Sequence, residues 1–162
     1  MGHGVVMASI EIRIEGLEKL QAGLAAGPTT LAAEVRTAMQ AGSLLIEGTA
    51  RGLAPKDTGR LAGSITHQIT GGGANLTSRI GPSVSYGLFA EKGRGAGTPP
   101  PVSAIRGWAT RHGMNPYALA RAIGRKGTKG KPYMEPAYKQ NVSGVIRLFE
   151  KIGYVVVARM AN

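Results

Sequence analysis

Apolar and polar residues alternate along residues 9–15, where isoleucine occupies every second position and charged residues lie between them. Such alternation places the isoleucines on one side of an extended chain and predicts a strand with one buried face. Gly16 ends this strand. Leucines at helical spacing then predict a short helix or turn over residues 17–27.

A long amphipathic helix is predicted from Leu31 to about Gly52. Apolar residues recur there with the period of an α-helix, and alanines fill many of the remaining positions. Thr29 or Thr30 can cap its start, because a hydroxyl oxygen accepts from the first free backbone N–H groups. Pro55 closes it.

The pattern changes to β in the middle of the chain. Residues 61–70 and 76–80 predict two strands joined by a flexible turn at the three glycines 71–73. Residues 86–91 predict a third strand. Together these segments predict an antiparallel meander.

Three helices are predicted in the second half, over residues 101–111, 116–124 and 135–160, the last with a bend or a short terminal strand as open alternatives. The predicted fold class is therefore α+β. An antiparallel meander packs against the long N-terminal-half helix and the C-terminal helix, and a small helical insertion covers about 101–128.

Residues 1–162 are expected to form a single domain, with 1–8 as a flexible leader. Three glycine-rich loops, 71–75, 92–100 and 124–132, are expected to become ordered only on assembly with partners.

The positive charge of the chain is concentrated in one block. Twenty Lys and Arg against nine Asp and Glu give a net charge of +11, and residues 92–139 hold ten basic residues and one acidic residue. This asymmetry indicates a surface for a polyanion or an acidic protein, and a merely solvated basic face is an equal alternative.

Contact with DNA phosphates or an acidic partner is expected from basic residues in or beside a glycine-rich loop. They are Arg121, Arg125, Lys126, Lys129 and Lys131. Tyr117, Tyr133 and Trp108 are candidates to stack on bases. The pattern favours non-specific phosphate contact over sequence readout.

The chemistry-bearing residues do not indicate an enzyme, a cofactor or a metal site. Cysteine is absent, Asp57 is the only aspartate, and the three histidines lie far apart in sequence. No nucleophile elbow, HExxH or Walker loop is present. No apolar run reaches the length of a membrane-spanning helix, so no membrane association is expected.

Three motifs in order carry a resemblance to a known family: LAPKDTGRLAGSI from Leu53, then GPSVSYGLFAEKGRG followed by a Pro-rich loop, then KPYMEPAYKQN. The last includes a P-(F/Y)-(L/M)-x-P-A pattern, matched by Tyr133, Met134, Pro136 and Ala137. Over residues 9–160 the chain resembles the neck or tail-completion proteins of tailed phages that are related to gene product ten of phage Hong Kong 97.

The resemblance implies a non-enzymatic, structural virion protein at the head–tail junction, present in the host cytoplasm during assembly. It implies a homo-oligomeric ring, sixfold or twelvefold, between head-completion or connector proteins and the tail terminator or tail tube. Genomic DNA in the channel is a candidate non-specific contact. The alternative is a free basic nucleic-acid-binding protein.

Two groups of residues are singled out. The motif turn is Asp57, Thr58, Gly59, Arg60 and Leu61, in which the first two side chains are expected to accept backbone N–H bonds and Gly59 to adopt a positive φ. The assembly-interface residues are Arg60, Glu91, Arg94, Pro99, Pro100, Pro101, Tyr133, Met134 and Pro136. Tyr133 and Met134 are also expected to pin the terminal helix to the sheet.

Overall fold

The computed structural model describes residues 9–13, 29–72 and 75–160. Their elements, in chain order, are β1 (Ile10–Arg13), α2 (Thr29–Leu53), α3 (Arg60–Ser64), β2 (Ile65–Gly72), β3 (Asn75–Pro82), α4 (Gly87–Lys92), β4 (Gly93–Arg94), α5 (Val102–Arg111), α6 (Pro116–Lys126), β5 (Thr128–Lys129) and α7 (Met134–Met160).

A three-stranded antiparallel sheet in the order β1-β3-β2 forms the centre of the fold. Ile80 of β3 lies opposite Ile10 on one side and His67 on the other. Alternate residues of β3 are buried under α2, whereas the other face of the sheet is polar and exposed, with an ion pair between Arg79 and Glu11 at 2.9 Å. The period-two pattern of the sequence thus places one sheet face in the core.

The core lies between this sheet and two long helices. α2 packs on β2 and β3 and lies alongside α7. The helices approach closely because Gly42 has no side chain: a Cβ there would lie 3.1 Å from Cγ1 of Val145. The largest cluster of buried residues comprises Ile46, Ala50, Ala54, Leu61, Ile65, Ile80, Tyr133, Met134, Ala137 and Val145.

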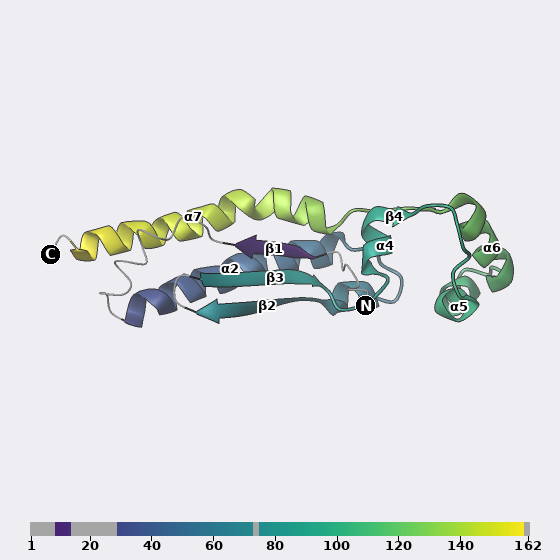
Figure 1. The fold of residues 1–162 in the computed structure, drawn as a ribbon, viewed down its shortest axis with the longest axis horizontal. Coiled ribbons are helices and arrows are strands. Elements are labelled where there is room, and N and C mark those ends of the chain that lie inside the picture. Colours follow the sequence, from purple (N-terminus) through teal and green to yellow (C-terminus); the bar gives the residue numbers. More distant parts are fainter. Residues whose placement is uncertain (1–8, 14–28, 73–74, 161–162) are drawn as a thin grey trace, which may run out of the picture.

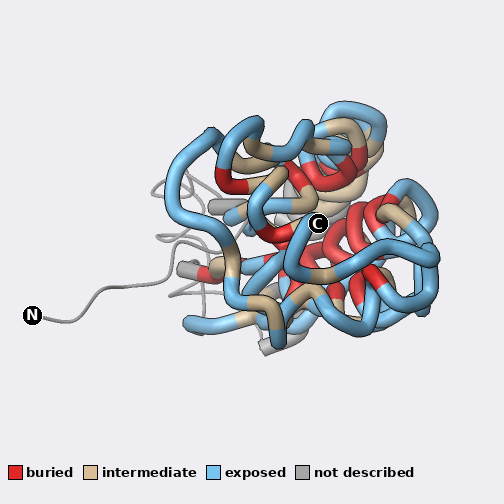
Figure 2. Tube along the Cα trace, turned by 90° about the vertical axis from the view of Figure 1, so that its right-hand side faces the viewer, coloured by how far each residue is buried: buried red, intermediate tan, exposed pale blue. Residues whose placement is uncertain are grey.

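The molecule is elongated (Figure 1). The sheet, α2 and α7 form a body, and α5 and α6 form a separate helical lobe at the end opposite the C-terminus. The paired strands β4 and β5 join the two parts. Figure 2, which views the molecule onto the lobe end, shows buried residues surrounded by exposed chain.

The α+β class and the predicted long helices are confirmed. α2 runs to Leu53, and α7 is one continuous helix through Gly144 and Gly153, so the alternative of a terminal strand at 155–157 is wrong. α5 and α6 also form where helices are predicted, with α6 ending at Lys126 rather than at Gly124.

The third strand of the predicted meander is wrong. Residues 87–92 form helix α4, and the third strand of the sheet is β1. Gly87, at the start of this helix, packs so closely on Pro82 and on the hydroxyl of Tyr133 that a Cβ would not fit. The predicted strand over 61–70 begins only at Ile65, since Arg60–Ser64 is helical.

The expected ordering of two glycine-rich loops only on assembly does not fit the structure. Residues 92–100 and 124–132 already pair through β4 and β5, and the amide of Gly97 donates to the carbonyl of Gly124 at 2.7 Å. The predictions for residues 1–8, Gly16 and 17–27 lie outside the described residues.

Candidate functional site

The stalk that carries the helical lobe is built from glycine backbone. Gly93 lies opposite Lys129, and Arg94 opposite Thr128. A Cβ at Gly93, Gly127 or Gly130 would collide with backbone atoms of the facing segment, and the first two residues have φ of +77° and +70°. These close contacts fix the direction in which the lobe leaves the body.

A buried carboxylate organises the base of the stalk. Oε2 of Glu91 accepts from the backbone amides of Tyr133 at 2.7 Å and Met134 at 2.9 Å, and its Oε1 accepts from the amide of Glu135 at 3.1 Å. These are free N–H groups at the start of α7, where the helix dipole also favours a negative charge. Glu91 therefore ties α4 to α7.

Tyr133 is fully buried beside this carboxylate. Its hydroxyl donates to the carbonyl of Gly87 at 3.2 Å. Burial, together with the negative charges of the neighbouring Glu91 and Tyr86, raises the pKa of Tyr133 to about 12. The expected anchoring of α7 by Tyr133 and Met134 agrees with their place in the core cluster.

This burial corrects two predictions. Glu91, Tyr133 and Met134 do not present their side chains at a surface, so they are unsuited to the direct interface contact expected of them. Tyr133 is equally unable to stack on a base. Of the other expected interface residues, Arg60, Pro99 and Pro101 are exposed, while Arg94, Pro100 and Pro136 are partly exposed.

The motif turn has two predicted features and one unpredicted feature. Gly59 has a φ of +76°, and the Oγ1 of Thr58 accepts from the amide of Arg60 at 3.5 Å. Asp57, expected to hold backbone amides, instead pairs with Arg111 of the lobe, whose Nε lies 3.2 Å from Oδ1. The hydrogen bond from Arg111 lowers the pKa of Asp57, and the same bond raises the pKa of Arg111.

A cleft of about 800 Å³ lies between the lobe and the body, beside this ion pair. The body contributes the motif turn, Tyr86 and Ala90 to its wall, and the lobe contributes side chains from α5 and α6. Ile105 and Trp108 of α5 both line it, which agrees with their spacing of one helical turn. The ring of Trp108 stacks on His112 at a centroid distance of 4.0 Å.

The predicted DNA or acidic-partner residues all belong to the lobe and its stalk. Arg121, Arg125, Lys126, Lys129 and Lys131 are exposed. The segment from Lys92 to Pro132 holds nine basic residues and no acidic residue. Within the described residues, the ion pair to Asp57 is the only one that reaches this segment.

A second surface has the opposite character. Between Arg36 and Arg51, the only charged residue of α2 is Glu47, which is buried. The outward side of the helix instead carries Leu44 and Leu45, which are 50% and 45% exposed. Sequence analysis did not identify this face, although the available signal was that 13 of the 14 residues between Arg36 and Arg51 are uncharged.

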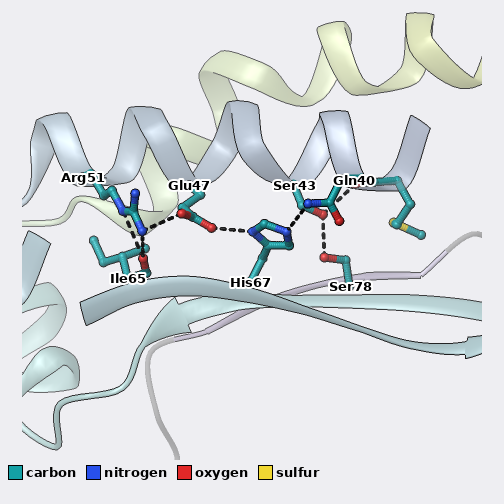
Figure 3. A network of polar contacts seen from close by, with 8 residues as sticks. Gln40, Ser43, Glu47, Arg51, Ile65, His67 and Ser78 are labelled. Atoms are coloured by element: carbon teal, nitrogen blue, oxygen red, sulfur yellow. Dashed lines mark hydrogen bonds and ion pairs between the residues drawn. The ribbon is translucent and has the colours of Figure 1, made fainter. Parts of the chain in front are cut away.

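A polar network lies between α2 and the sheet (Figure 3). His67 Nδ1 donates to Glu47 Oε2 at 2.5 Å, and the amide nitrogen of Gln40 lies 2.9 Å from the other ring nitrogen. Glu47 also pairs with Arg51 at 2.6 Å, and Arg51 donates to the carbonyl of Ile65. The side chains of this network all have partners within the fold, so the network positions α2 on the sheet.

The hydroxyls nearby are similarly occupied. Ser43 donates to the carbonyl of Met39 at 2.7 Å and lies 2.6 Å from Ser78. The sequence carried a signal for this network, because Ser43 and Glu47 share the helix face of Met39 and Ile46.

Over the described ranges, no three His, Asp or Glu residues gather as metal ligands do, and no helix is long and apolar enough to cross a membrane. The chain matches no family model, no curated protein and no solved structure.

Proposed function

We propose that this chain is a structural subunit that assembles with copies of itself into a ring at the head–tail junction of a tailed phage. The observation that carries the proposal is the uncharged outward face of α2 on a chain of net charge +11. Copies with the same strong charge repel one another, so they associate best where each presents no charge. Exposed adjacent leucines are typical of a protein contact.

The local geometry of α2 suits close packing against a neighbour. Gly48 and Gly52 are exposed, and a Cβ at either would meet no atom within 4 Å. Glycines in the middle of a helix reduce its stability relative to alanine. Their presence on the same side as Leu44 and Leu45 allows another backbone to approach.

A closed ring needs a heterologous contact, in which two different surfaces meet. Tyr138 and Ile146 of α7, 40% and 52% exposed, form the second surface. They lie eight residues apart and therefore share one side of the helix. The α2 face of one subunit packs on this side of α7 in the next subunit.

The helical lobe is then left free at one end of the subunit. The nine basic residues of the lobe and its stalk, from Lys92 to Pro132, are available to an acidic neighbour in the virion or to DNA in the channel. The same charge supports the second candidate function, a free basic nucleic-acid-binding protein. The two candidate functions differ because the ring subunit requires self-association through α2, whereas the free nucleic-acid-binding protein does not.

Light scattering of the purified chain over a range of concentrations tests the proposal. The wild type is expected to reach a closed mass of six or twelve subunits, and L44E/L45E to remain a monomer with an unchanged circular dichroism spectrum. The matched control T66E/Q68E adds the same charge to the exposed sheet face and is expected to assemble. Assembly of L44E/L45E like the wild type contradicts the proposal.

A further inference from the structure

We infer that the α5–α6 lobe is a helix–turn–helix unit that binds duplex DNA with α6 in the major groove. The inference goes beyond the proposed ring, because it concerns the lobe of a single chain. It starts from the arrangement of the two helices: a 10-residue helix, the turn His112–Asn115 and an 11-residue helix. In Figure 1, α5 is seen nearly end-on and α6 from the side, so the helices cross.

The turn between the helices is closely specified. Gly113 has a φ of +65°. The amide of Gly113 donates to the carbonyl of Thr110 at 3.1 Å, and the amide of Met114 donates to the carbonyl of Ala109 at 2.8 Å. This pair of bonds is the Schellman arrangement, which ends a helix sharply. Asn115 then caps α6 by accepting from the amides of Tyr117 and Ala118. DNA-binding helix–turn–helix units have such short, glycine-containing turns.

Small buried residues hold the two helices together. Ala109 of α5 and Ala120 of α6 are buried, and the helices pack on each other. The far end of α6 is held by the loop before α5, where a Cβ on Gly124 would lie 2.8 Å from Cγ of Pro99. The second helix is therefore presented on a fixed support, as groove recognition requires.

The outward face of α6 suits a groove. Tyr117, Arg121 and Arg125 are four residues apart in succession, so they form one line along the helix. All three are exposed, and none lines the cleft, which takes Leu119 and Ile123 from this helix. Ala118, beside this line, leaves space for approach to the base edges. The major groove is about 12 Å wide and admits an α-helix.

Charge around this face favours DNA over an acidic protein. Arg106 on α5 is exposed and lies outside the cleft, and Lys126, Lys129 and Lys131 follow α6. Protein interfaces are depleted of lysine, whereas arginine and tyrosine are common in them. Here the two arginines of α6 are followed by three lysines, and no acidic residue lies between Lys92 and Pro132, which suits a row of phosphates and guanine edges.

Fluorescence anisotropy with a labelled 24-base-pair duplex tests the charge requirement. R121A/R125A is expected to weaken DNA binding at least tenfold at 100 mM salt. It is also expected to reduce the magnitude of the slope of log association constant against log salt concentration by about 1.8, because each lost phosphate contact contributes about 0.9. The control R147A/K151A removes the same charge from exposed positions of α7 and is expected to change affinity less than threefold.

A steric variant separates groove docking from general attraction. A118W adds bulk to the outward face of α6 without changing charge and is expected to weaken binding tenfold. It is also expected to remove the protection of guanine N7, a major-groove atom, from dimethyl sulfate. S143W places the same bulk on an exposed position of α7 and is expected to bind like the wild type.

Three results overturn the inference: equal weakening by the two charge variants, full binding by A118W, or tighter binding of the wild type to polyglutamate than to the duplex. The last would assign the lobe to an acidic protein. None of these results bears on self-association through α2, which is measured separately by mass.

Discussion

At the scale of single residues, the carboxylate of Glu91 joins three parts of the chain. It accepts from three backbone amides at the start of α7 and lies in the segment that leads into the stalk. Removal of this side chain would leave those buried N–H groups without partners, and each such loss is costly. The acidic residue in the SYGLFAEKG motif therefore has a structural role that its sequence position did not indicate.

Replacement of Glu91 by alanine is expected to lower the free energy of unfolding by about 3 kcal/mol, because buried bonds to a charged group are lost. Urea denaturation measures this change. The control E150A removes a carboxylate from an exposed position of α7 and is expected to change stability by less than about 0.5 kcal/mol. Similar midpoints for E91A and E150A would show that the carboxylate does not hold α7.

Tyr133 predicts a loss of stability at high pH. Its pKa in the fold is about 12, above the usual value of 10.0. Between these values the unfolded chain loses the proton while the folded chain keeps it, so stability falls as pH rises from about 10 to about 12.

Denaturation of the wild type and Y133F at pH 9 and at pH 11 checks this expectation. Y133F loses the hydroxyl bond to Gly87 and is expected to be less stable at pH 9. Because it lacks the titrating group, its stability is expected to fall less between the two pH values. Parallel losses in both proteins would contradict a raised pKa at this position.

At the scale of elements, sequence periodicity predicted the long helices and all three strands of the core sheet, together with an additional strand at 86–91 that is helical. Those elements are fixed by local signals: the repeat of apolar residues and the glycine or proline at the ends. α4 was predicted as a strand because its apolar residues suit either structure. The helix contacts Pro82 and Tyr133, and Tyr133 lies 46 residues away from Gly87, so a short sequence window does not contain this environment.

The candidate site was predictable in composition but not in arrangement. The basic block identified the residues of the lobe, whereas its presentation on a glycine stalk depends on pairing between segments more than thirty residues apart. The ion pair between Asp57 and Arg111 joins positions separated by 54 residues, so local turn chemistry could not reveal it.

The stalk predicts a selective effect of one glycine substitution. Gly127→Ala places a Cβ against the carbonyl of Arg94 at a φ of +70° and a ψ of −165°, a conformation that only glycine adopts readily and that costs an alanine about 1–3 kcal/mol even without the collision. Hydrogen exchange of α5 and α6 is expected to accelerate about tenfold, while α2 and the sheet remain protected. Gly144→Ala on α7 meets no neighbouring atom and serves as the control.

Uniform acceleration throughout the G127A protein would contradict this account. It would mean that the lobe and the body unfold as one unit, and that the stalk does not separate them.

At the scale of the whole molecule, two surfaces with different properties lie on one elongated subunit. The uncharged face of α2 suits contact between like-charged copies, and the basic lobe at one end suits a polyanion. A ring built through α2 and α7 would repeat the lobe around its axis. Weak binding by each lobe would then be reinforced, because several lobes would engage one partner together.

Electron microscopy of particles formed without this chain tests the central claim most directly. The account predicts DNA-filled heads beside unattached tails when the gene is deleted from the phage, and complete particles when the wild-type chain is supplied. The L44E/L45E variant is expected to fail in this rescue, whereas T66E/Q68E restores it. Normal tailed particles in the absence of the chain would contradict a role at the head–tail junction.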